Sequence, residues 1–433
     1  MALELTVEKM VYGGDGLARY ADEAHAQEGR GKTVLLPFVL ESEHVAASVT
    51  EQKRSFMRAF PEKVLSASPH RVEPACPYFT RCGGCHYQHA GYEHQLAIKS
   101  GVLRETLLRT AKIDWQGDIQ VHASPPWNYR NRTRVKVQSD PFAIGYYRFG
   151  SHTLLGVEQC PISSPLINRA LTAVWKLGRK GDLNPIAEIE FFANADDSSL
   201  LLGATVGQDE VNDAALEKVA QELCDAVPEI AGVVFFAAEP GGSVQPISAF
   251  GDQEFTYATR SASYRVGAGS FFQTNRFLID ELVQLMVADR KGKLALDLYA
   301  GVGLFTLPLA KNFAQVAAVE SSPASFADLE HNSTKNVAAH RATTETFLEK
   351  LPKVFTQPDY VVADPPRAGL GERVAASLAK LGAPQLAYLS CDPATLARDL
   401  KILIAGGYRI AAIHLIDLFP QTFHIESAVF LSR

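Results

Sequence analysis

Strand-like and helix-like segments alternate regularly from residue 275 to the C-terminus, and this alternation limits the possible folds more than any other feature. Short apolar runs of strand length are separated by longer segments whose apolar residues recur at helical spacing. Such a pattern predicts a doubly wound α/β sheet with helices on both faces. The expected strands cover 294–298, 315–320, 360–364 and 385–390, and the expected helices cover 275–289, 304–311, 323–338, 371–381 and 393–404.

The last two strand-like segments break this alternation, because only a short link containing Pro420 joins 410–416 to 424–432. A direct return predicts antiparallel pairing, since a parallel crossover needs about a dozen residues or more. The start of an antiparallel final strand lies at the edge where the parallel strands end. Glu426 is therefore expected near Asp364 and Cys391, unless it is an ordinary exposed strand residue.

The rest of the chain is too long to share one core with this sheet. At 433 residues, two or three domains are expected. Residues 1–66 contain short strand-like runs and glycine-rich turns, which favour a small all-β barrel. Residues 67–270 mix strands and helices without a clean period, so we expect an α+β central domain. The predicted domains are 1–66, 67–270 and 271–433.

The same sequence carries no sign of export or membrane insertion. It contains no run of 18 apolar residues, and residues 1–10 alternate charged and apolar side chains without an apolar signal segment. Six cysteines are few for this length, so a disulfide framework is not expected. We therefore expect a cytoplasmic protein without a membrane partner, and a monomer is the default expectation.

A glycine-rich turn over 297–303 follows the first strand of the regular region, and its glycines allow a ligand to approach the backbone. Glu320 ends the next strand, where its carboxylate could bind ribose hydroxyls. The third glycine of a dinucleotide motif is missing, because Thr306 takes its place. This departure and the antiparallel last strand favour S-adenosylmethionine over NAD. A tight turn without a ligand is the alternative.

Cys391 ends the strand at 385–390, and Asp392 and Pro393 follow as a good N-cap and first helical residue. The positive end of the helix favours thiolate over thiol, so Cys391 is a candidate nucleophile. A buried core cysteine is the alternative. Asp364-Pro365-Pro366 at another strand end also suggests methylation of an exocyclic amine, although Arg367 follows where that motif has an aromatic residue.

A second group of cysteines lies outside the regular region. Three thiols fall within ten residues and a fourth lies farther along the chain: Cys76, Cys82, Cys85 and Cys160. Four thiolates suit either zinc or an iron–sulfur cluster. The spacing is not that of a zinc ribbon, and His86, His89 and His94 keep a mixed zinc site open. Unligated buried cysteines are the remaining alternative.

Positive charge is concentrated in the middle of the chain. The whole chain has a net charge of −6, whereas residues 71–150 carry 11 basic and 6 acidic side chains. Within them Arg130, Arg132 and Arg134 alternate along a strand-like run, with Trp127 and Tyr146 nearby in sequence. Cations and aromatic rings hold phosphates and stack unpaired bases, so this stretch is a candidate RNA contact. A solvated edge strand is the alternative.

Together these segments resemble the RNA uracil-5-methyltransferase family, in particular its iron–sulfur, 23S rRNA-type branch, over nearly the whole chain. The most specific motifs are Ser-Cys-Asp-Pro at 390–393, Asp-Leu-Phe-Pro-Gln-Thr-x-His-x-Glu at 417–426 and Ser-Phe-Phe-Gln-Thr-Asn at 270–275. The resemblance implies a TRAM (OB-like) RNA-binding barrel at 1–66, and a 4Fe–4S cluster on the four grouped cysteines. It also implies a Rossmann-like domain binding S-adenosylmethionine through Gln273, Tyr299, Gly301, Glu320 and Asp364. Leu304 departs from the family, because some members carry a cofactor-contacting Asn there.

The resemblance further implies covalent chemistry on RNA. Cys391 would add to carbon 6 of an exposed uracil, and Glu426 would remove the carbon-5 proton after methyl transfer. The expected partner is 23S rRNA, with tRNA as an alternative. Three other hypotheses remain at this point: an exocyclic-amine methyltransferase, an RNA-binding protein with a relict cofactor domain, and a redox role for the cluster.

Overall fold

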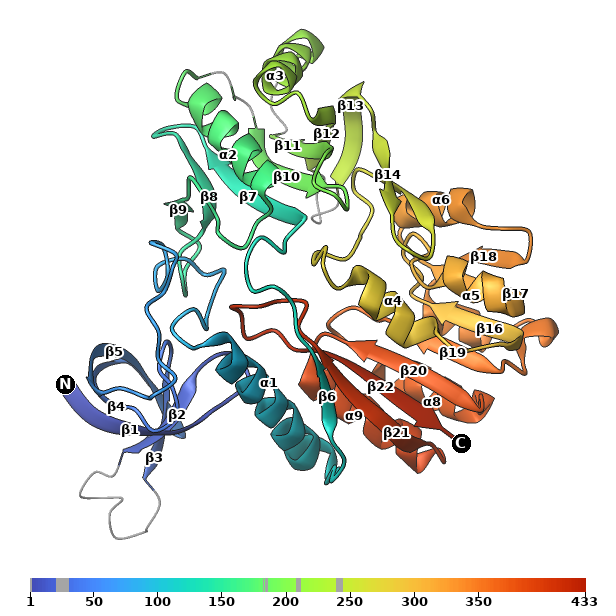
Figure 1. Ribbon diagram of the computed structural model, residues 1–433, viewed down its shortest axis with the longest axis horizontal. Helices are drawn as coiled ribbons and strands as arrows, with labels where there is room; N and C mark the ends of the chain where they lie inside the picture. Colours follow the sequence, from blue (N-terminus) through green and yellow to red (C-terminus); the bar gives the residue numbers. More distant parts are fainter. Residues whose placement is uncertain (1, 21–30, 182, 184–185, 208–211, 239–243) are drawn as a thin grey trace.

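The chain forms a small barrel, a central sheet and a large C-terminal sheet, which follow one another in sequence except for one strand, β6, of the C-terminal sheet (Figure 1). This is the architecture of a computed structural model that describes residues 2–20, 31–181, 183, 186–207, 212–238 and 244–433. A separate hairpin of β14 (Glu254–Ala258) and β15 (Ser263–Gly267) precedes the C-terminal sheet. The cleft described below lies on the C-terminal sheet.

The predicted N-terminal barrel is confirmed, and it closes in the order β1-β2-β3-β5-β4. Alternate residues such as Val34 and Leu36 or Val45 and Ala47 are buried inside it, as the period of a strand requires. Gly16 permits close packing, since a Cβ there would lie 2.5 Å from the side chain of Val39. The strands are β1 (Ala2–Met10), β2 (Gly16–Tyr20), β3 (Lys32–Leu36), β4 (His44–Gln52) and β5 (Phe56–Ser66).

The central segment forms a seven-stranded sheet in the order β13-β12-β11-β10-β7-β8-β9. Two helices, α2 (Pro165–Gly178) and α3 (Asp213–Ala226), pack on it with residues at helical spacing, such as Leu166, Ala170 and Val174. Its strands are β7 (Arg132–Gln138), β8 (Ala143–Tyr147), β9 (Leu154–Gly156), β10 (Ile186–Ala193), β11 (Leu200–Val206), β12 (Ile230–Ala238) and β13 (Val244–Gly251).

The C-terminal sheet is doubly wound, as predicted, with the order β18-β17-β16-β19-β20-β22-β21-β6. β22 pairs antiparallel with both β20 and β21, which confirms the expected return at the end of the chain. Its strands are β16 (Gly292–Leu298), β17 (Phe313–Glu320), β18 (Val337–Arg341), β19 (Tyr360–Ala363), β20 (Gln385–Ser390), β21 (Arg409–Ile416), β22 (Glu426–Ser432) and β6 (Ile119–His122).

Helices cover both faces of this sheet, because successive strand residues point to opposite sides. Along β20, Leu386 and Tyr388 belong to one core, and Ala387 and Leu389 to the other. The helices are α4 (Ile279–Val287), α5 (Thr306–Asn312), α6 (Pro323–Asn332), α7 (Thr344–Glu349), α8 (Gly371–Leu381) and α9 (Pro393–Ala405). Among the described helices, none is both long and apolar enough to cross a membrane.

Three elements of this sheet differ from the sequence prediction. The helix expected over 323–338 ends at Asn332, and β18 follows it as an edge strand. The short helix α7 was not predicted. The apolar residues of the β18 segment, Val-Ala-Ala, fit a helix as well as a strand, so only pairing with β17 decides its state. β6 comes from the middle of the chain and joins β21 as a parallel edge strand.

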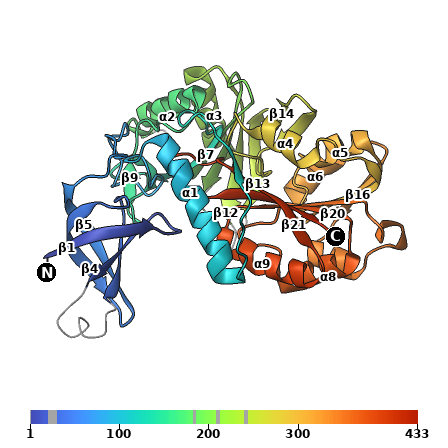
Figure 2. The ribbon, with the colours of Figure 1, turned by 60° about the horizontal axis from the view of Figure 1, so that its bottom comes forward.

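Helix α1 (Tyr92–Thr106) continues as a π-helical turn over Leu107–Ala111 and lies beside α9 (Figure 2). One side of α1 joins the core of the C-terminal sheet. Three polar residues at helical spacing, Tyr92, Gln95 and Lys99, instead bond the loop at 417–425 that connects β21 to β22. The ammonium of Lys99 lies 2.5 Å from Asp417, and both side chains are at most 1% exposed. The helix thus fixes this loop with a buried ion pair.

Lys99→Met should destabilise the protein by about 3–5 kcal/mol, because it leaves the Asp417 carboxylate buried without its cation. Urea unfolding followed by circular dichroism measures the loss. Adding Asp417→Asn to Lys99→Met removes the unpaired charge and should recover part of the stability. Lys218→Met, which breaks an exposed helical ion pair with Glu222, is the matched control and should change little. Equal stability of the Lys99 and Lys218 variants would contradict this role of the buried pair.

Candidate active site

A cleft of about 740 Å³ opens at the carboxyl edge of the C-terminal sheet, where ligands bind in folds of this kind. The seven residues predicted to act in catalysis or to bind the cofactor all line it: Gln273, Tyr299, Gly301, Glu320, Asp364, Cys391 and Glu426. They come from the ends of four parallel strands, from the start of β22 and from the segment before α4. The structure brings these residues together, and their roles remain predictions.

Strand pairing places Cys391 opposite Glu426. β20 and β22 run antiparallel with Ser390 paired to Ser427, so the next residue of one strand faces the preceding residue of the other. The Ser427 hydroxyl also donates to the Ser390 carbonyl at 3.4 Å. A thiol and a carboxyl group therefore share one edge of the cleft, as expected from an antiparallel last strand.

The turn after Cys391 has the predicted capping geometry. One oxygen of the Asp392 carboxylate accepts hydrogen bonds from the amides of Ala394 and Thr395, each at 2.9 Å, and Pro393 begins α9. This arrangement holds the backbone beside the thiol in one conformation.

The expected activation of the thiol by the helix N-terminus is wrong. Burial, together with the charges of Glu426 and Asp364 and against the opposing charge of Arg367, raises the pKa of Cys391 to about 12. The helix N-terminus does not outweigh the burial and the two carboxyl groups. Burial and Asp364 also raise the pKa of Glu426 well above its usual range. At neutral pH this site therefore favours a protonated thiol.

The glycine turn leaves open space for a ligand. Gly301 has a φ of +57°, and no described atom lies within 4 Å of the position a Cβ would take there. Its amide donates to one oxygen of Glu320 at 2.9 Å, and the Ser322 amide donates to the other at 2.6 Å. The Thr306 hydroxyl, where a dinucleotide motif has glycine, donates to buried Asp297 at 2.5 Å. The threonine that replaces the motif's third glycine thus has a structural role, as a hydrogen-bond donor to Asp297.

The ionisation of the Asp364 carboxyl group is sensitive to nearby charge. Burial raises its pKa to about 7, with a further contribution from Asp297. The side-chain amide of Gln273 lies 3.4 Å from its carboxyl group. Because a nearby cation favours the ionised form of a carboxyl group, this site can accept a positively charged ligand by releasing a proton.

Sequence reasoning missed three residues of the cleft. Arg367 places a guanidinium nitrogen 3.3 Å from the ring of His424, and both line the cleft with Cys391 and Glu426. In the sequence, Arg367 was notable only because it occupies the position where the Asp-Pro-Pro motif has an aromatic residue. Phe271 is 61% exposed and also lines the cleft. An exposed aromatic ring within the 270–275 motif was the available signal.

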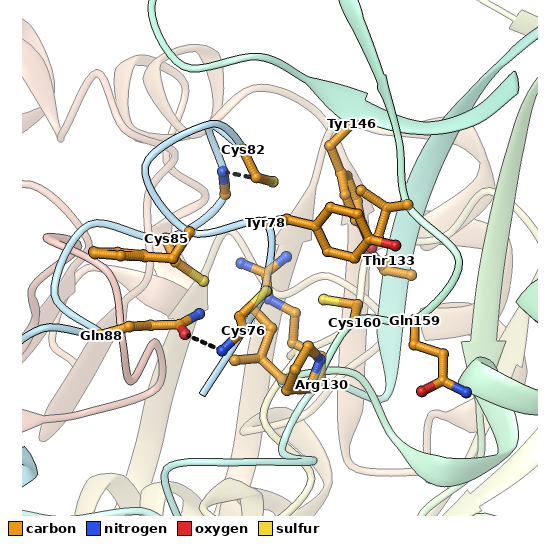
Figure 3. A pocket seen from close by; sticks show the side chains of 15 residues that line it. Cys76, Tyr78, Cys82, Cys85, Gln88, Arg130, Thr133, Tyr146, Gln159 and Cys160 are labelled. Carbon is orange, nitrogen blue, oxygen red and sulfur yellow. Dashed lines mark hydrogen bonds between the residues drawn. The ribbon is translucent and has the colours of Figure 1, made fainter. Parts of the chain in front are cut away.

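The four grouped cysteines line a separate cavity of about 80 Å³. Figure 3 shows their sulfur atoms around one space, with the rings of Tyr78 and Tyr146 beside it and Arg130 next to Cys76. Cys85 is buried and the other three cysteines are partly exposed. Burial raises the pKa of Cys82 to about 11 and that of Cys85 to about 12. None of the six cysteines of the chain forms a disulfide. The cavity thus presents four thiols that can act as ligands.

The described residues do not form a site for a single metal ion. Among the described residues, no three His, Cys, Asp or Glu side chains are grouped closely enough to hold one metal ion. Ligands of one zinc ion must all approach the same atom, whereas each cysteine of a cubane cluster binds a different iron. The residues lining the cavity, all of them described, do not include His86, His89 or His94, so the geometry does not favour the mixed zinc site.

The three predicted RNA-binding arginines lie in different environments. Arg130 lines the cysteine cavity. Arg132 is buried and bonds Glu190 at 2.6 Å, while exposed Arg134 lies 3.2 Å from both Glu188 and Glu190. The glutamates come from β10, which pairs with β7. Cross-strand acidic residues thus pair with Arg132 and Arg134, and the geometry gives no support to an RNA contact by Arg132.

Known proteins match the whole of this architecture. The family model described as tRNA (uracil-5-)-methyltransferase matches residues 91–433. An uncharacterized RNA methyltransferase of Aquifex aeolicus is 33% identical over 99% of this chain and 98% of its own. The 23S rRNA (uracil(1939)-C(5))-methyltransferase RlmD of Pectobacterium atrosepticum is 30% identical over 99% of this chain and 93% of its own.

A solved structure has the same fold. The tRNA (uracil-54, C5)-methyltransferase of Pyrococcus abyssi, in complex with S-adenosyl-L-homocysteine, matches with a TM-score of 0.75 and 22% identity. The match covers 99% of this chain and 100% of that protein. Since the family model spans most of the chain and both relatives extend over nearly all of it, the chain belongs to the tRNA (uracil-5-)-methyltransferase family.

Proposed function

We propose that this enzyme transfers a methyl group from S-adenosylmethionine to carbon 5 of a uridine in 23S rRNA, through a covalent intermediate on Cys391. The observation that carries the proposal is the pairing of β20 with β22, which sets Cys391 opposite Glu426 at the cleft. The similarity to an RlmD protein supports 23S rRNA as substrate. The family description and the Pyrococcus structure keep tRNA as the alternative.

The cofactor is proposed to bind across the glycine turn. Glu320 is placed to accept hydrogen bonds from ribose hydroxyls, and the open space beside Gly301 admits the nucleoside. Tyr299, with a φ of +65°, turns the backbone at the end of β16. Asp364 and Gln273 then lie at the sulfonium end, where the positive charge favours ionised Asp364.

Cofactor binding also prepares the thiol. The cleft holds three acidic groups, on Asp364, Cys391 and Glu426, beside the guanidinium of Arg367. A sulfonium brings a second positive charge, which lowers the pKa of Cys391 and of Glu426. The thiol proton passes to solvent, and the thiolate then forms a carbon–sulfur bond to carbon 6 of the uracil. The electron pair of the carbon 5–carbon 6 double bond moves onto the carbonyl at carbon 4 as an enolate.

Methyl transfer and release complete the reaction. The enolate attacks the methyl group through carbon 5, and S-adenosylhomocysteine leaves with the electron pair of the broken carbon–sulfur bond. Glu426 then takes the proton from carbon 5, the double bond re-forms and the Cys391 thiolate is expelled. A well-placed base contributes roughly 10²–10⁴-fold to such a step. The uracil must leave its stack to reach the cleft, so an unpaired or flipped nucleotide is required.

The other predicted features complete the proposal. We propose that residues 1–66 act as an RNA-binding TRAM barrel, and that the boundaries at 66 and 270 separate three domains of a cytoplasmic monomer. Cys76, Cys82, Cys85 and Cys160 would hold a 4Fe–4S cluster, whose cross-link ties the segment before α1 to the loop before α2. A structural role is favoured over electron transfer, because the cleft chemistry needs no electron.

Glu426→Gln should accumulate a covalent enzyme–RNA adduct, because the amide keeps the shape of the side chain but cannot remove the carbon-5 proton. The adduct is measured as an RNA-bearing protein band that survives SDS and carries the labelled methyl group. Cys391→Ala is the control. It should bind S-adenosylmethionine normally in calorimetry but form no adduct and lose methylation. Normal turnover by Cys391→Ala would exclude the covalent mechanism and favour amine methylation at Asp364-Pro365-Pro366.

Anaerobically purified protein should contain about four iron and four sulfide per chain, with broad visible absorption. Cys85→Ser should lose most of both, because it removes a ligand from the cavity. Cys224→Ser is the matched control, since Cys224 lies on α3 outside the cavity, and should keep iron and colour. Equal iron content in the two variants would exclude a cluster at this site.

The RNA substrate can be identified by comparing RNA methylation in cells with and without the gene. Mapping of 5-methyluridine should show loss of methylation at one uridine of 23S rRNA and none in tRNA, and the purified enzyme should restore it on the unmodified rRNA. Loss confined to a tRNA position would overturn the assignment to rRNA and leave the covalent mechanism in place.

A further inference from the structure

The first turn of the N-terminal barrel contacts the residue that follows the proposed nucleophile. Tyr12 lies between β1 and β2, and its hydroxyl donates to an oxygen of Asp392 at 3.0 Å. Asp392 caps α9 and directly follows Cys391. A side chain of the barrel therefore bonds the residue next to the proposed nucleophile.

This contact is part of a close fit rather than an isolated bond. The ring of Tyr12 meets the ring of Phe423 edge to face, with centroids 5.7 Å apart. Gly14 has a φ of +91°, and a Cβ there would lie 3.2 Å from the Cβ of His86 and 3.3 Å from that of Phe423. The barrel turn thus packs between the segment that contains Cys76, Cys82 and Cys85 (the cysteine segment) and the 417–425 loop that precedes Glu426.

We propose that Tyr12 is a positioning residue for Cys391, so that the barrel completes the methyltransferase site in addition to any contact with RNA. The inference rests on the proposed function, in which Cys391 is the nucleophile. Its physical basis is that the two carboxylate oxygens of Asp392 accept hydrogen bonds from different donors. One carboxylate oxygen accepts the two amides of the helix cap, and the other accepts the Tyr12 hydroxyl. Together they fix the plane of the carboxylate and the turn that carries the thiol.

The hydroxyl also affects charge at the thiol. Among the described ionisable groups, Glu426, Asp364 and Arg367 act on Cys391, and both Asp392 and Cys391 act on Tyr12. Burial and the charge of Asp392 raise the pKa of Tyr12 above its usual range, so the phenol remains a donor. Removing this donor leaves the Asp392 charge less compensated beside Cys391. The thiolate then becomes harder to form, and its formation moves to higher pH.

Tyr12→Phe in the full-length enzyme tests the proposal, because it removes the hydroxyl and keeps the ring that packs on Phe423. We expect kcat for methylation to fall about tenfold, as for loss of a hydrogen bond to a charged group, with KM for RNA unchanged. Alkylation of Cys391 by iodoacetamide in the RNA-free enzyme, followed by peptide mass spectrometry, should shift to higher pH. Tyr20→Phe, at the opposite end of β2, is the matched control and should match the wild type in all three measurements.

The alternatives give different results. An unchanged kcat and alkylation profile in Tyr12→Phe would overturn the positioning role. A higher KM for RNA with unchanged kcat would overturn it as well, because Tyr12 would then contact only the substrate. Full turnover by Cys391→Ala would instead overturn the proposed covalent function, so the failure of one hypothesis is distinguishable from the failure of the other.

Discussion

The antiparallel pairing of β22 with β20 is the interaction on which the active site depends. The pairing sets Ser390 opposite Ser427 and so brings Cys391 and Glu426 to one edge. A slip of one residue would turn every side chain of β22 to the other face of the sheet. Both faces are buried, with Val429 in one core and Ala428 in the other, so such a slip is strongly disfavoured. The hydrophobic cores thereby protect the geometry of the site.

The loop at 417–425 joins the rest of the molecule to this strand. α1 fixes the loop through the Lys99–Asp417 ion pair and through Gln95, whose side chain bonds both the backbone and the side chain of Gln421. Backbone amides of the cysteine segment donate to the Gln421 carbonyl, and the barrel turn packs on Phe423. All three parts of the chain therefore meet immediately before Glu426. Through these contacts, the barrel and the cysteine segment can influence the position of Glu426.

The charges and burial of the cleft favour the protonated form of the Cys391 thiol. Burial raises the pKa values of Asp364, Cys391 and Glu426. Asp297 adds to the rise at Asp364, and neighbouring carboxyl groups add to it at Cys391 and Glu426, where Arg367 opposes it. A low thiolate content limits unwanted alkylation or oxidation of Cys391. In the proposed reaction the sulfonium supplies the missing positive charge, so that nucleophile and methyl donor become available together.

Features under local control could be predicted from the sequence: the strand and helix alternation, the Asp392 cap, the glycine turn and the motifs that identify the family. Features that depend on distant neighbours became apparent only in the folded chain. β6 joined a sheet far along the chain, β18 became a strand by pairing at an edge, and Glu190 neutralised arginines that a single strand presents as a cationic face. Burial likewise reversed the expected ionisation of Cys391. Capping and turn formation need only adjacent residues, whereas burial and charge pairing are set by segments that the chain brings together only when it folds.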